Sequence, residues 1–312
     1  MSAEPEHDDA LEFTGERFTP ECVREIVYEH WHRYAWARGL VAGKDVLDCA
    51  CGEGYGSRLL ADRARSVVGV DVDPEAVAHA RKRYAADKLE FVEADALDLP
   101  FDDDRFDVVV SFETLEHLAD HDELLAGFRR VLKPGGVLLL SSPDKRTYSD
   151  LTGYDNEFHV RELYRDELEG LLGRHFPNYR LHGQKLMFHS LLWSLDDRED
   201  RDAQHLTSAE DGTVTAGPQP AAEPLYFLVV AAADGVALPA PPALSLFSDE
   251  AESIYAHYNE EVRKHIAAGH LLAEREQEIE RLRAELDRAR AGTGSADDSS
   301  TWTRLRRWLT KR

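Results

Sequence analysis

Short apolar runs alternate with helix-forming segments between Lys44 and Ser142. Each run is rich in aliphatic residues and ends at a turn or an acidic residue, and the runs fall at 46–47, 67–70, 91–92, 108–110 and 137–140. Such runs are typical of strands that are buried on both faces of a parallel sheet. The repeated strand–helix units predict right-handed crossovers and a doubly wound α/β domain.

Helices are predicted between these runs. They cover 57–64, 74–86 and 121–132, with Pro74 in the first turn of its helix and Asp73 as the cap. A further helix is expected at 165–173, followed by strands at 178–183 and 224–231. The polar segment between those two strands, from about 196 to 223, is long for a connection, and we expect it to be mobile.

The pattern divides the chain into a central domain and two flanking regions. The domain covers 44–236, and the segment 1–43 before it contains an aromatic helix that could form a lid or simply pack. A Pro/Ala-rich linker at 237–249 is followed by a strongly helix-forming stretch at 250–290. A Gly/Ser/Asp spacer at 291–300 and a basic amphipathic tail at 301–312 complete the sequence.

The helix at 250–290 carries a heptad pattern that Arg275 interrupts. Its apolar seam consists of Leu272, Ile279 and Leu286, with Leu282 and Ala289 at the partner positions. This pattern favours homo-oligomerisation through a short coiled coil, and the alternative is a solvated single helix. The tail combines tryptophan with arginine, so it could contact an anionic membrane surface, a glycosyltransferase or the protein's own acidic body.

Composition narrows the range of functions. The 312 residues carry a formal charge of -23, which argues against nucleic acid as a partner because phosphates would be repelled. Three cysteines are too few for a disulfide framework, and no stretch has the length and apolarity of a membrane span. The acidic N-terminal stretch does not resemble a signal peptide. We therefore expect a cytoplasmic protein. Such a protein could also make peripheral contact with the inner face of the membrane.

A glycine-rich turn follows the first strand and carries the candidate chemistry. Gly52, Gly54 and Gly56 would let the backbone approach a ligand closely, and Asp48 stands just before them. Asp71 ends the next strand and could accept hydrogen bonds from both ribose hydroxyls of a nucleoside. A dinucleotide would place its pyrophosphate against the acids of this turn. A cationic nucleoside without phosphate suits the turn better.

A further acidic residue follows the third predicted strand. There Asp95 could accept a hydrogen bond from an adenine amino group, while the Ala96 backbone N–H meets the ring. Three acids at three successive strand ends match one ligand, S-adenosylmethionine. The full set of predicted cosubstrate contacts is Asp48, Gly52, Gly54, Gly56, Asp71, Val72, Asp95, Ala96 and Ser111.

Over residues 13–232 the sequence resembles the class I S-adenosylmethionine-dependent methyltransferases. The resemblance rests on five stretches at 46–56, 68–74, 94–101, 106–111 and 132–138. It implies a seven-stranded, mostly parallel, Rossmann-like sheet whose last strand is antiparallel. It also implies that Asp48 and the glycine turn face the methionine part of the ligand, Asp71 the ribose and Asp95 the adenine.

The edge that follows Ser111 should open onto the methyl group. If the acceptor is a hydroxyl, a base is needed, and His117 is the first candidate with Glu116 to orient it. The stretch resembles the Glu-x-x-Glu-His of ubiquinone-pathway O-methyltransferases, where it is linked to a divalent metal. That resemblance implies that Glu113, Glu116 and His117 could hold Mg²⁺, and ordinary helix capping is the alternative for Glu113.

A second cluster surrounds His159. The stretch at 156–162 resembles one found after the fifth strand in methyltransferases that act on sugars and related small molecules. His159 could be a second base or an acceptor-binding group, or it could anchor this loop by hydrogen bonds.

Taken together, the sequence predicts methyl transfer from S-adenosylmethionine to a sugar hydroxyl of a surface polysaccharide or glycolipid. The stretch at 15–20, Gly-Glu-Arg-Phe-Thr-Pro, resembles methyltransferases found with bacterial polysaccharide glycosyltransferases. The alternatives are O-methylation of a quinone-like phenol or a natural product, and a scaffold that binds S-adenosylmethionine without turnover.

Overall fold

The computed structural model describes residues 19, 25–192, 205–209, 212–217, 220 and 222–292. The chain divides into two compact units, Met1–Asp249 and Glu250–Arg312. The predicted basic tail at 301–312 and most of the predicted spacer at 291–300 lie outside the described residues, as does much of the predicted segment 1–43.

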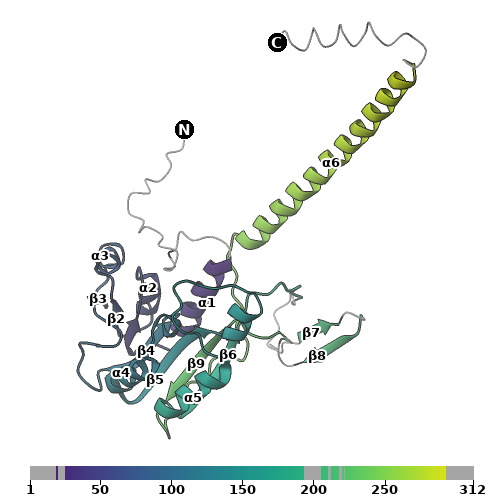
Figure 1. Cartoon of the computed structure of the whole chain (residues 1–312). Coiled ribbons are helices and arrows are strands. Elements are labelled where there is room, and N and C mark those ends of the chain that lie inside the picture. The colour runs from purple at the N-terminus through teal and green to yellow at the C-terminus, as the bar shows by residue number, and fades with distance from the viewer. Residues whose placement is uncertain are drawn as a thin grey trace. The chain divides into compact units, whose positions relative to one another are not determined.

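The first unit is built on a seven-stranded sheet (Figure 1). Its strands are β1 (Asp45–Cys49), β2 (Ser66–Asp71), β3 (Leu89–Glu93), β4 (Phe106–Phe112), β5 (Leu132–Pro143), β6 (Asn178–Gln184) and β9 (Tyr226–Ala232). They lie in the order β3-β2-β1-β4-β5-β9-β6, and β9 runs antiparallel to both of its neighbours. This arrangement confirms the doubly wound, mostly parallel sheet and its antiparallel last strand.

Helices cover both faces of this sheet. The helices α1 (Glu25–Arg38) and α2 (Tyr55–Ala61) pack on one face, and α4 (His121–Val131) and α5 (Arg165–His175) pack on the other. The helix α3 (Pro74–Arg83) lies against β3, and its cap Asp73 accepts a hydrogen bond from the Glu75 backbone N–H at 2.8 Å. Neighbouring residues of β1 point to opposite faces, Val46 towards α1 and Leu47 towards α4. Burying each such side chain contributes about 1.5–3 kcal/mol.

Two features lie outside the central sheet. Within the predicted insertion, β7 (His205–Ser208) and β8 (Val214–Gly217) form an antiparallel two-stranded sheet, which the sequence pattern did not predict. The second unit contains α6 (Ser253–Gly292), a helix of 40 residues that confirms the predicted helical extension. None of the helices among the described residues has the length and apolarity needed to span a membrane.

Candidate active site

The glycine turn joins β1 to α2 at the carboxyl edge of the sheet. Ala50, Gly52 and Gly54 all have positive φ, at 60°, 57° and 97°, so three of these five residues adopt a backbone conformation that favours glycine. A Cβ on Gly54 would lie 2.8 Å from Ala80 and from the Phe91 ring. The turn therefore needs glycine at Gly54 both for its dihedral angle and for space.

Gly56 has a different role from the other two glycines. It lies in the first turn of α2, and a Cβ there would come within 2.2 Å of the Tyr34 ring. Tyr34 is a buried residue of α1, so Gly56 lets α1 pack closely against α2. Its predicted contact with a cosubstrate stays a prediction.

Asp48 lies beneath the turn with none of its surface exposed. Its carboxylate accepts hydrogen bonds from the Ser57 hydroxyl at 2.6 Å and the Tyr34 hydroxyl at 3.1 Å. Burial raises the pKa of Asp48 to about 7 despite these two donors. The Asp48 carboxyl group therefore changes charge near neutral pH, next to the glycine turn.

Asp71 connects the end of β2 to the same turn. Its carboxylate accepts from the Gly52 backbone N–H at 2.8 Å and from the Asp73 backbone N–H at 3.0 Å. These bonds fix the second strand end against the glycine turn, as a shared ligand would require. The next residue, Val72, is 67% exposed, so its side chain is open to a ligand.

The third strand end is more open. Asp95 is exposed and accepts from the Leu97 backbone N–H at 2.9 Å, and Ala96 beside it is half-buried. Ser111, in contrast, is fully buried within β4. The predicted acids of β1, β2 and β3 therefore lie at one edge of the sheet, because adjacent parallel strands end there. Ser111 was predicted to contact the cosubstrate, but its side chain is not exposed.

The buried cysteines take no part in a metal cluster among the described residues. Cys49 and Cys51 are both free thiols, and burial raises the pKa of each above its ordinary value. A thiol in that state is protonated and unreactive.

The short helix η1 (Leu115–His117) follows β4 at the carboxyl edge of the sheet and contains the predicted base, His117. The Nδ1 of His117 lies 3.0 Å from the Phe158 carbonyl oxygen, which is a hydrogen-bond acceptor only. Nδ1 therefore carries the proton, and Nε2 is the basic nitrogen of the neutral ring. The Glu116 backbone carbonyl accepts from the Val160 and Arg161 N–H groups at 2.8 and 3.0 Å. The loop at 156–162 is thus fastened onto η1.

His159 lies next to His117, with their ring centres 5.0 Å apart. Its Nδ1 lies 2.5 Å from Glu162 Oε1, and its Nε2 lies 2.9 Å from the Asn156 amide nitrogen. The Asn156 amide oxygen already accepts from the Phe158 N–H, so the amide nitrogen donates to His159. Both ring nitrogens are thereby engaged within the loop.

The group of candidate metal ligands in the structure differs in one residue from the predicted set of Glu113, Glu116 and His117. Glu113 accepts from the Ser141 hydroxyl at 2.6 Å and pairs with Arg33 at 3.5 Å. The group that the described residues do bring together is Glu116, His117 and His159, whose candidate ligand atoms lie within 4.8 Å of one another. Two imidazoles and one carboxylate suit a transition metal, whereas Mg²⁺ prefers oxygen ligands. These residues do not fit Mg²⁺.

Arg33 of α1 was not predicted as a site residue. It is 1% exposed, and its Nε donates to the Gln184 side-chain oxygen at 2.7 Å. Its guanidinium lies 4.3 Å from the centre of the Tyr226 ring. Because Arg33 also pairs with Glu113, it ties α1, β6 and β9 to the end of β4. An arginine inside a run of aromatic residues was the only sequence signal for this role.

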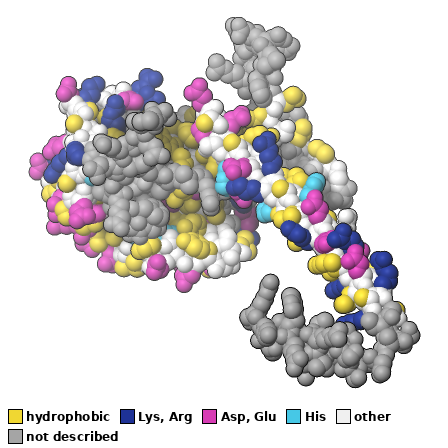
Figure 2. Space-filling model, turned by 90° about the horizontal axis from the view of Figure 1, so that it is seen from above, with side chains coloured by type: hydrophobic (Ala, Val, Ile, Leu, Met, Phe, Trp, Pro, Cys, Tyr) yellow, Lys and Arg dark blue, Asp and Glu magenta, His cyan; other side chains and the backbone are white. Residues whose placement is uncertain are grey.

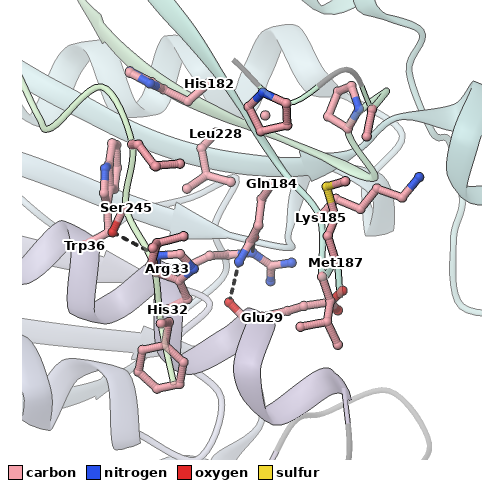
Figure 3. Close-up of a pocket in the computed structure, with 18 of the residues that line it drawn as sticks. Glu29, His32, Arg33, Trp36, His182, Gln184, Lys185, Met187, Leu228 and Ser245 are labelled. Atoms are coloured by element: carbon pink, nitrogen blue, oxygen red, sulfur yellow. Dashed lines mark hydrogen bonds between the residues drawn. The ribbon is translucent and has the colours of Figure 1, made fainter. Parts of the chain in front are cut away.

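A cavity of about 630 Å³ lies beside Arg33 (Figure 3). It is lined by α1, by the ends of β6 and β9 and by the segment 242–248. Its wall mixes aromatic, aliphatic and polar side chains, among them Trp36, Leu228 and Gln184. His32 contacts the Ser245 hydroxyl at 2.9 Å across it. A cavity of this size and mixed lining suits a small organic ligand.

Comparison with known proteins finds a methyltransferase-like region within this unit. Residues 47–140 match a family model described as "Methyltransferase domain". Over these residues the unit is similar to that methyltransferase domain, and its sheet has the order β3-β2-β1-β4-β5-β9-β6.

Individual relatives cover about half of the chain. A Mycolicibacterium smegmatis protein named "Probable S-adenosylmethionine-dependent methyltransferase" is 43% identical over 168 residues, 52% of this chain and 64% of that protein. The phthiotriol/phenolphthiotriol dimycocerosates methyltransferase of Mycobacterium leprae is 39% identical over 48% of this chain and 62% of its own. The chain thus spans less than two thirds of either relative. The solved YcgJ protein of Bacillus subtilis is 19% identical with a TM-score of 0.47, over 66% of this chain and 100% of its own.

Proposed function

We propose that this protein transfers the methyl group of S-adenosylmethionine to a hydroxyl of a small, sugar-like acceptor. The observation that carries the proposal is the edge of the sheet where Asp48, Asp71 and Asp95 lie at or just beyond the ends of β1, β2 and β3, beside the glycine turn. Residues 48–56 contain acids and no basic side chain. Such an edge favours a cationic nucleoside and disfavours phosphate.

The transfer is an in-line displacement at carbon. The acceptor oxygen forms a bond to the methyl carbon while the bond from that carbon to sulfur breaks, and its electron pair stays on the sulfur as a neutral thioether. Much of the rate comes from holding the two reactants in line. The acceptor's proton goes to Nε2 of His117, whose orientation the Phe158 carbonyl fixes. His159 is assigned a positioning role, because Glu162 and Asn156 hold both of its nitrogens.

The acceptor is assigned to the cavity beside Arg33. Arg33 lines this cavity and pairs with Glu113, four residues before His117, which connects the cavity wall to the segment that carries the proposed base. Trp36 and Gln184 offer the flat apolar surface and the hydrogen-bonding groups that a sugar uses. A lipid with a free hydroxyl is the second candidate. Leu228 and Met187 in the wall support it, as does the name of the M. leprae relative.

Two measurements test this function separately. Calorimetry should show uptake of S-adenosylmethionine, with a loss of about a hundredfold in Asp71→Ala and none in the control Asp103→Ala, an exposed acid at the opposite edge. Label from S-adenosylmethionine should reach a glycan or a lipid acceptor, and His117→Ala should lower turnover about a hundredfold or more with uptake unchanged. Uptake without turnover on any acceptor would instead support the scaffold. Absence of uptake would refute both.

A further inference from the structure

The apolar side chains of the second half of α6 form an exposed seam. Leu272, Ile279, Leu282 and Leu286 are between 47% and 65% exposed. Spacings of seven and three residues place these four on one side of an uninterrupted helix. Figure 2 shows apolar side chains between charges of both signs along this helix. A seam of this kind is stable in water when another helix covers it.

The charges beside the seam identify the partner. With Leu272, Ile279 and Leu286 at heptad position a, the flanking g positions hold Glu278 and Glu285. The flanking e positions hold Arg283 and Arg290. In a parallel, in-register pair, each g residue meets the e residue five positions further along the other helix. Glu278 would meet Arg283, and Glu285 would meet Arg290.

The same charges exclude the antiparallel arrangement. In an antiparallel pair g positions face g positions and e positions face e positions. Glutamates would then oppose glutamates and arginines would oppose arginines. Ile279 at position a and Leu282 at position d follow the preference of two-stranded parallel coils. We infer that a second copy of this chain covers the seam of α6, forming a parallel, in-register, two-stranded coiled coil.

Arg275 is the one charged residue within the seam, at position d. A polar residue at such a position weakens a coil but restricts its register, because a slipped pairing would bury the charge against an apolar layer. The intrahelical pair between Glu278 and Arg281, at 2.7 Å, lies on the flank and leaves the seam apolar. Dimerisation is therefore expected to be specific in register and sensitive to single substitutions.

Sedimentation of the full chain at micromolar concentrations tests the pairing. The expected mass is twice 35.2 kDa. Leu282→Lys should yield the monomer, whereas Ala284→Lys, which adds the same charge on the opposite side of the helix, should not. A monomeric wild-type protein would overturn the inference. So would a dimer that tolerates Leu282→Lys.

Charge reversal tests the flanking pairs. Glu278→Arg and Arg283→Glu should each weaken dimerisation about tenfold or more, because two symmetric attractions become repulsions. Mixing the two variants should restore it, since the mixed pair again joins opposite charges. A dimer that is equally strong in all three samples would contradict the assigned pairing.

Cross-linking tests the orientation. Under oxidation Ala289→Cys, at a seam position, should form a disulfide between two copies, while Ala284→Cys on the outer side should not. Oxidised wild-type protein gives the background from the native cysteines. A dimer that forms without the Ala289→Cys cross-link would refute the parallel register.

Discussion

We expect the buried carboxyl group of Asp48 to make cosubstrate uptake dependent on pH. In the unligated protein, burial raises the pKa of this group to about 7, although Ser57 and Tyr34 donate to it. A positively charged ligand above the glycine turn favours the ionised form. We therefore expect S-adenosylmethionine to bind the form in which Asp48 carries a negative charge, and to displace its proton.

The size of the effect follows from that pKa. If only the ionised form binds, the apparent affinity is reduced about twofold at pH 7 and about tenfold at pH 6, relative to alkaline solution. At pH 7 binding should release about half a proton per chain. Calorimetric titrations in buffers of different ionisation enthalpy measure both quantities.

The Asp48→Asn variant is the control, because its side chain cannot titrate. It should bind more weakly than the wild-type protein above pH 8, with little change in affinity between pH 6 and pH 8. The pKa of Asp48 in the folded protein lies above the ordinary carboxyl value of 3.8, so unligated wild-type protein should lose stability through this group as the pH rises from about 4 to 7. An affinity that is flat from pH 6 to pH 8 in the wild-type protein would refute the reasoning.

Two further predictions concern packing and buried charge. Gly56→Ala should lower the free energy of unfolding by about 2 kcal/mol, because its Cβ meets the Tyr34 ring, while Gly170→Ala in open space on α5 should cost nothing. Equal denaturation midpoints for these two variants would contradict the close approach of α1 and α2. Burial raises the pKa of Glu116 well above its ordinary value, so Glu116→Gln should cost about 1 kcal/mol or less. Glu113→Gln should cost about 2 kcal/mol because it weakens the pair with buried Arg33. A thermal unfolding experiment in which Glu116→Gln lowers the midpoint more than Glu113→Gln does would contradict both expectations.

The central sheet could be predicted because its signals are local. The apolar runs at 67–70 and 108–110 mark buried strands directly, and the observed β2 and β4 contain them. Asp73 and Pro74 fixed the start of α3 by short-range capping chemistry. The β7–β8 hairpin was missed because each of its strands is only four residues long and mostly exposed, so neither leaves a run of buried apolar residues in the sequence.

The site was harder to predict, because its contacts join distant parts of the chain. The proximity of His117 and His159 depends on how the loop at 156–162 docks on η1, which no spacing reveals. The resemblance instead grouped Glu113 with Glu116 and His117, three residues that are close in sequence. Glu113 also pairs with Arg33, 80 positions earlier in the chain. Only the packing of α1 against the sheet brings that pair together.

The place of β9 in the sheet has a consequence for how the protein is made. β9 lies between β5 and β6 and pairs with both, yet it follows β6 in the chain by some forty residues. A nascent chain that has not yet reached Tyr226 leaves the apolar edge of β5 without its neighbour. Open strand edges of that kind promote aggregation, and such long-range pairing is slow. Completion of the domain must therefore wait until the ribosome has released the segment beyond Ala232, and genetic truncations before it should accumulate as insoluble protein.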